Sequence, residues 1–148
     1  MLSIKVPLFN LKDTDYRTVI VRPRFYLINE ETGQPGVEFA QVGQAFQIAP
    51  TKKPYYTIDL TDFDIFLPSG GFFAGIELLG SVNDQGKLNV QPVPGERIDI
   101  RGAISKPNGH TTYIKVNEKE WYKLMDFMGP IVKGKKQVNA SFELLVLE

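Results

Sequence analysis

The chain has 148 residues, of which 43% are hydrophobic, and this is enough for one domain over residues 1–148 with a single core. Its 17 basic and 17 acidic side chains cancel, which argues against nucleic acid as a partner, because that partner requires excess positive charge. The absence of cysteine excludes disulfides and cysteine-ligated metals, and no apolar run reaches the roughly 18 residues of a transmembrane segment.

Alternation of apolar and polar residues predicts a long strand over residues 18–29, with one apolar face and one mixed face. The mixed face carries Arg22, Arg24 and Tyr26. Proline has no N–H for a strand ladder, so we expect the strand to lie at a sheet edge or to be bulged near Pro23. The apolar face is formed by Val19, Val21, Pro23, Phe25 and Leu27.

Two further segments show the same period of two. Residues 55–60 and 63–67 alternate in opposite phases, which predicts two short strands with a turn or bulge at Thr61 and Asp62. Residues 72–82 predict a central strand in which Glu77 points away from the apolar face. That apolar face consists of Phe72, Ala74, Ile76, Leu78 and Val82.

The rest of the chain completes an all-β pattern. Residues 96–105 and 111–117 predict a hairpin around "PNGH", and residues 137–148 predict a last strand that ties the end of the chain into a sheet. The segment 118–128 is the one candidate helix, with apolar residues at helical spacing. We therefore predict a two-sheet antiparallel β-sandwich, jelly-roll-like, with at most one short helix.

Catalytic and metal-binding signatures are weak. We interpret His110 as a solvated hairpin residue, because one histidine without cysteine makes no typical zinc site and has no recognisable catalytic partners. The aspartates Asp59, Asp62 and Asp64 suit either turn capping or calcium, and the turn context favours capping. The sequence thus predicts no catalytic residue, no metal and no cofactor.

The polar strand faces carry the best candidate site. If Glu77 and the pair Arg22 and Arg24 meet on one sheet surface, we expect an ion pair, which is either a structural anchor or part of a ligand-binding patch. Aromatic rings such as Tyr113 and Trp121 belong either to the core or to a platform on which a sugar stacks. The candidate ligand-binding residues are Arg22, Arg24, Tyr26, Glu77, Tyr113 and Trp121.

Three stretches in order, "RPRFYLINEETGQPG", "YYTIDLTDFDIFLPSGGFFAGIELLG" and "EWYK", resemble the C-terminal region of Bacteroidetes proteins described as carboxypeptidase-regulatory-like or surface-associated. In that group an Arg-x-Arg-x-Tyr strand precedes a Gly-x-Pro-Gly turn, an Asp-Leu step and a strand ending in Phe-x-Gly-Ile-Glu. Leu78 departs from the pattern, which has an aromatic residue there. The matching positions are Arg22, Arg24, Phe25, Tyr26, Gly33, Pro35, Gly36, Asp59, Leu60, Phe73, Gly75, Ile76 and Glu77.

The resemblance implies a jelly-roll-like sandwich in the periplasm or on the surface of a bacterial cell envelope, with no assigned catalytic residue, although the first residues lack the regions of a signal peptide. We therefore expect a non-enzymatic binding or accessory module whose ligand is a glycan. A protein-interaction domain that docks through a sheet edge or an apolar patch is the alternative, and a glycoside-active enzyme is a third.

Overall fold

The computed structural model describes residues 1–7, 18–49, 51, 53–82, 85–90, 102–105, 113–115, 120–123, 137–140 and 143–146. Within these ranges every element of regular secondary structure is a β-strand. They are β1 (Leu2–Pro7), β2 (Thr18–Ile28), β3 (Pro35–Gln41), β4 (Phe46–Ile48), β5 (Tyr55–Asp59), β6 (Phe72–Val82), β7 (Leu88–Asn89), β8 (Gly102–Ser105), β9 (Tyr113–Lys115), β10 (Trp121–Lys123), β11 (Gln137–Ala140) and β12 (Glu143–Val146).

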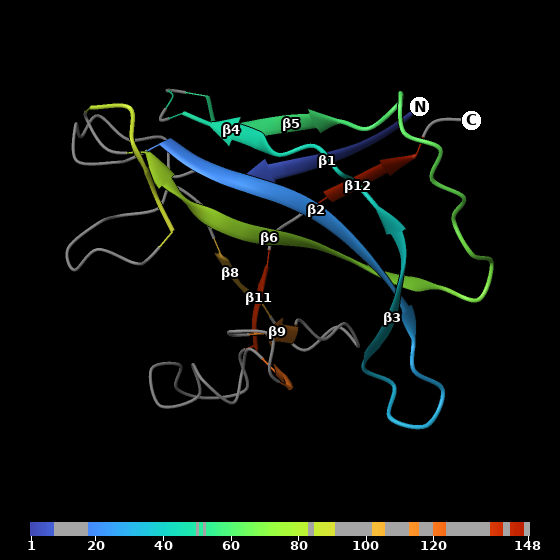
Figure 1. Ribbon diagram of the computed structural model, residues 1–148. Coiled ribbons are helices and arrows are strands. Elements are labelled where there is room, and N and C mark those ends of the chain that lie inside the picture. The colour runs from blue at the N-terminus through green and yellow to red at the C-terminus, as the bar shows by residue number, and fades with distance from the viewer. Residues whose placement is uncertain are drawn as a thin grey trace.

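The strands form two main antiparallel sheets (Figure 1). A five-stranded sheet has the order β3-β2-β6-β7, with β4 also paired to β2, and a three-stranded sheet has the order β12-β1-β5. Two-stranded ribbons, β8 with β11 and β9 with β10, complete the described strands. The predicted all-β, two-sheet sandwich is confirmed, whereas the jelly-roll connectivity stays a prediction.

The core lies between the two main sheets because their facing strands alternate apolar and polar residues. Phe25 of β2 is fully buried, and its ring lies 6.1 Å from that of Phe39 and 6.3 Å from that of Phe72, measured between centroids. Burial of each such side chain contributes about 1.5–3 kcal/mol. The buried apolar residues are Leu2, Ile4, Val6, Val19, Val21, Phe25, Val42, Ile48, Ile58 and Leu60.

Pro23 coincides with a break in the neighbouring strands. On one side of β2, β4 pairs as far as Val21 and β3 pairs from Arg24 onward. The two residues between these ladders, Arg22 and Pro23, thus pair with no described strand on that side, while both pair with β6 on the other. The prediction of an edge or a bulge near Pro23 is thus met by a local gap between two ladders on one side of β2.

A bulge in β6 shifts the phase of its last residues. The register passes from Val21 opposite Leu78 to Ile20 opposite Gly80, so Leu79 is an extra residue. Because of this shift Ser81, which pairs with Val19, is buried, and Val82 lies on the other face opposite Thr18. The expectation that Val82 continues the apolar face of β6 is therefore wrong.

Near β5 one prediction is confirmed and another needs correction. The turn after Asp59 is confirmed by the Phe63 N–H, which donates to the Leu60 carbonyl at 3.1 Å. Residues 63–67, however, do not form a strand. They cover the core edge instead, where Phe63, Ile65 and Leu67 pack against the buried cluster.

The last third of the described chain pairs differently from expectation. The strand β8 pairs with β11 and β9 pairs with β10, so the described residues do not form the expected hairpin of β8 with β9. The candidate helix is wrong over Trp121–Lys123, which form β10, and Glu120 before them is not helical either, whereas residues 118–119 and 124–128 lie outside the described residues. The predicted last strand is two strands, β11 and β12, and β12 does join the main sheet through β1.

Candidate functional site

The five-stranded sheet turns one side away from the three-stranded sheet, and we call this side the outer face. Alternation along β2 buries Val21, Pro23 and Phe25 and turns their neighbours to the outer face. In the β2–β6 ladder, Arg22 pairs with Glu77, Arg24 with Gly75 and Tyr26 with Phe73. Residues paired across antiparallel strands share a face. The outer face is thus carried by Arg22, Arg24, Tyr26, Phe73, Gly75 and Glu77.

Four side chains on the outer face form a charged cluster: Arg22, Arg24, Glu38 and Glu77. Arg24 donates from Nε to Oε2 of Glu77 at 2.9 Å and from one terminal nitrogen to both oxygens of Glu38 at 2.8 and 2.9 Å. Gly75 lies opposite Arg24, and because it has no side chain the guanidinium can reach diagonally to Glu77. The predicted pairing of arginine with Glu77 is confirmed.

Arg24 is the centre of this cluster. Its hydrogen bonds with Glu77, and next those with Glu38, raise its pKa above its ordinary value. These hydrogen bonds thus favour the charged form of the guanidinium. It joins β3 to β6 across β2, since Glu38 lies on β3 and Glu77 on β6.

Aromatic side chains form a second group beside the charged cluster, which we call the ring cluster: Tyr26, Phe73, Tyr113 and Trp121. Trp121 meets Tyr26 edge-on with 5.1 Å between ring centroids, and Tyr113 meets Phe73 edge-on at 5.5 Å. These contacts, each worth about 0.5–1.5 kcal/mol, hold the β9–β10 ribbon against the outer face. Figure 1 shows β9 on the opposite side of β2 and β6 from β1 and β5.

The ribbon also brings a cation to the rings. Lys115 pairs with Trp121 in the β9–β10 ladder, and its Nζ lies 5.5 Å from the centroid of the Trp121 ring. An ammonium at this distance is attracted by the ring face. The four rings are each half-buried, so part of every ring stays open to solvent.

All six residues proposed from the sequence lie on or against the outer face. Arg22, Arg24 and Glu77 are in the charged cluster, and the other three are in the ring cluster. Sequence reasoning missed Glu38 and Lys115. Glu38 reaches the outer face because of a bulge in β3, where the register passes from Ala40 opposite Phe25 to Glu38 opposite Tyr26. A signal for this bulge is the adjacent pair Phe39 and Ala40, both of which pack against the core.

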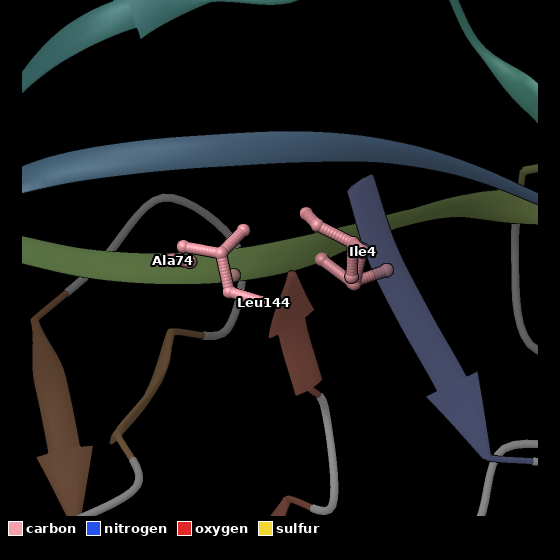
Figure 2. Close-up of a pocket in the computed structure, with 5 residues that line it drawn as sticks. Ile4, Ala74 and Leu144 are labelled. Carbon is pink, nitrogen blue, oxygen red and sulfur yellow. The ribbon is translucent and has the colours of Figure 1, made fainter. Parts of the chain in front are cut away.

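Two hollows in the described part of the molecule lie away from these clusters. Figure 2 shows the smaller one, of about 70 Å³, where Ile4 of β1, Ala74 of β6 and Leu144 of β12 converge. This volume is far below the roughly 300–1,000 Å³ of typical ligand pockets. The second, of about 240 Å³, is at the end of the core between Leu60, Phe63 and Val146. Neither hollow is lined by the charged or the ring cluster.

The aspartate-rich turn behaves as a cap. Oδ1 of Asp59 accepts hydrogen bonds from the Thr61 hydroxyl at 2.6 Å and from the Thr61 N–H at 2.9 Å. The hydroxyl bond, followed by the backbone bond, lowers the pKa of Asp59. The capping interpretation is thus confirmed for Asp59. His110 lies outside the described residues.

Within the described ranges, no three His, Cys, Asp or Glu side chains are grouped so that they could hold a metal ion. The same part of the chain contains no helix that is long and apolar enough to span a membrane.

Comparison with known proteins adds no relative. No protein-family model, no curated protein and no solved structure matches the chain. The resemblance to Bacteroidetes surface-associated proteins therefore stays a prediction. The outer face is the part of the molecule whose chemistry bears most on function.

Proposed function

We propose that the protein is a non-enzymatic binding module and that the outer face binds a glycan. The observation that carries this proposal is the contact of Trp121 with Tyr26 on the face that also holds the Arg24–Glu77 pair. Half-exposed rings and charged hydrogen-bonding groups thus adjoin on one surface.

The chemistry of this surface suits carbohydrates. A sugar ring has an apolar side, which packs on an aromatic ring, and hydroxyl groups, which hydrogen-bond with carboxylates and guanidinium groups. The edge-on contacts fix the orientation of the rings before a ligand arrives, so that little side-chain entropy is lost on binding. An open sheet face encloses a ligand poorly, and we expect dissociation constants in the micromolar to millimolar range.

Glycan-array binding followed by titration tests the proposal. Trp121 is the only tryptophan, so its fluorescence reports directly on the ring cluster. We expect Trp121→Ala to abolish binding on the array. The matched control is Tyr55→Ala, which removes an exposed ring from β5 of the other sheet and should leave binding unchanged. If no glycan binds the wild type at millimolar concentration, the proposal is wrong.

The geometry of the charged cluster favours a binding role over glycoside hydrolysis. A glycosidase needs two carboxyl groups that face the glycosidic bond. Both oxygens of Glu38 accept hydrogen bonds from Arg24 instead, and Glu77 accepts from the same guanidinium, so the two carboxylates are held by the protein. This arrangement supports a module without catalysis.

Protein docking is the second candidate, and one observation favours it. The side chain of Phe66 is 86% exposed, in the segment 63–67 that lines the 240 Å³ hollow. An exposed apolar group of this kind is typical of protein-interaction surfaces. Sedimentation of the wild type and of Phe66→Ser would test self-association through this end. A monomer at every concentration in both proteins would contradict a docking surface for a second copy.

The cell-envelope setting also belongs to the proposal. It is supported by the resemblance to Bacteroidetes surface-associated proteins, in the residues of β2 and β6 that build the outer face. Fractionation of a bacterium that expresses the full-length gene, with antibody detection in the periplasmic and outer-membrane fractions, tests it. Recovery in the cytoplasmic fraction alone would contradict it.

A further inference from the structure

The charged cluster has a closed half and an open half. In the closed half, Glu38 accepts from Arg24 with both of its oxygens, and the two side chains are about one-fifth exposed, at 19% and 20%. This carboxylate and the nitrogen that serves it are mutually satisfied. Glu38 and Arg24 therefore act as scaffold.

The open half is formed by Arg22 and Glu77, whose side chains are 32% and 30% exposed. Glu77 uses Oε2 alone: the bonds from Arg24 and the 3.7 Å ion pair with Arg22 all end on this oxygen. Among the described residues none donates to Oε1. This leaves a charged acceptor at the surface of the face.

Arg22, in turn, has a hydrogen-bond donor without an acceptor among the described residues. Its contact with Glu77 at 3.7 Å is longer than a hydrogen bond, and its Nε is buried with no acceptor among the described residues. A buried donor without a partner costs about 1–3 kcal/mol, and because Nε itself is covered, an oxygen from a ligand meets the guanidinium at its exposed part. Arg22 also lies at the break between β3 and β4, where no described strand pairs with β2 on that side.

We infer that the open half binds two neighbouring hydroxyl groups of a neutral oligosaccharide, one donating to Oε1 of Glu77 and one accepting from Arg22. A hydroxyl group both donates and accepts hydrogen bonds, so one of two adjacent hydroxyls can donate to Glu77 while the other accepts from Arg22. A carboxylate or sulfate on the ligand would set its charge against the free oxygen of Glu77, which disfavours acidic sugars. This inference rests on the glycan-binding function proposed above.

The spacing along β2 sets the size of the ligand. Arg22 and Tyr26 are four residues apart on one strand, a distance of about 13 Å at the usual rise. This separation is wider than a single pyranose ring. A ligand that touches both the open half and the ring cluster is therefore an oligosaccharide that lies along β2, not a monosaccharide.

Titration of Trp121 fluorescence with defined sugars tests the inference. The probes are glucose, the neutral hexasaccharides cellohexaose, maltohexaose, mannohexaose and xylohexaose, and the acidic hexagalacturonate. We expect at least one neutral hexasaccharide to bind, with glucose and hexagalacturonate at least tenfold weaker. Glu77→Gln and Arg22→Met should each weaken that binding about tenfold, the effect of one charge-assisted hydrogen bond.

The matched control is Glu38→Gln, which alters the closed half and should leave affinity within about twofold. Melting curves identify a variant that fails to fold, and Arg22→Met, which breaks no side-chain hydrogen bond with a described residue, keeps the test valid if Glu77→Gln unfolds. Equal losses for Glu38→Gln and Glu77→Gln would overturn the inference, as would tighter binding of hexagalacturonate or of glucose. In those cases glycan binding itself stands, whereas failure of every sugar overturns the proposed function as well.

Discussion

Replacement of Arg24 by methionine removes the centre of the charged cluster and keeps the apolar stem of the side chain. The change deletes three hydrogen bonds, at 2.8, 2.9 and 2.9 Å, and leaves Glu38 and Glu77 without their shared cation. The participating side chains are 19–30% exposed. The energetic cost of losing them should therefore lie between that of a surface ion pair, about 0–1 kcal/mol, and that of disrupting a buried ion pair, about 3–5 kcal/mol. We expect Arg24→Met to lower the free energy of unfolding by about 2–3 kcal/mol.

Equilibrium urea unfolding measures this loss directly, and for a chain of this length it corresponds to a decrease in Tm of about 4–12 °C. Arg22→Met is the matched control on the same strand and the same face. The Arg22 side chain makes an ion pair at 3.7 Å and no hydrogen bond with a described residue, and its replacement also removes the buried Nε that has no acceptor there, so Arg22→Met should cost no stability. If the two variants lose the same stability, Arg24 is not the anchor described above.

Three other predictions concern the fold. Phe25→Ala should cost about 3–5 kcal/mol in urea unfolding, because Phe25 is fully buried between the sheets; a loss below about 1 kcal/mol would contradict its place in the core. Gly80→Ala should destabilise strongly, because its φ is +155° and a Cβ would collide with the Asn89 carbonyl oxygen, whereas the control Gly43→Ala has open space and should be tolerated. Because folding lowers the pKa of Asp59, this carboxylate stabilises the folded protein above its unfolded-state pKa, and the stabilisation disappears as the pH falls through the folded-state pKa. The difference in Tm between wild type and Asp59→Asn should therefore decrease in acid. A difference that increases would refute the capping role of Asp59.

The faces of β2 and β6 were predictable from the sequence because the pleat of a strand converts alternation directly into two sides. Once Arg24 and Glu77 are assigned to polar faces, their meeting requires only that the two strands be neighbours. The same reasoning failed at Val82, because one extra residue at Leu79 reverses the phase and leaves no mark in the hydrophobic pattern.

The remaining parts of the site depend on strand pairing, which local patterns do not encode. Glu38 joins the cluster only through the bulge in β3, and Trp121 reaches Tyr26 only because β10 pairs with β9 and the ribbon lies on the outer face. The helical spacing around Trp121 was misleading because a short apolar segment fits both the 3.6-residue period of a helix and the two-residue period of a strand. The strand β1 was missed although Leu2, Ile4 and Val6 alternate, and all three are buried.

The pairing of β1 with β12 determines when the protein can finish folding during its synthesis. Ile4 pairs with Leu144, so the three-stranded sheet joins residues from opposite ends of the described chain. At a synthesis rate of roughly 5–20 residues per second, β1 waits about 7–30 s for its partner. During that interval the edge of β1 that later receives β12 lacks this partner, and an unpaired strand edge is a position where another chain can add.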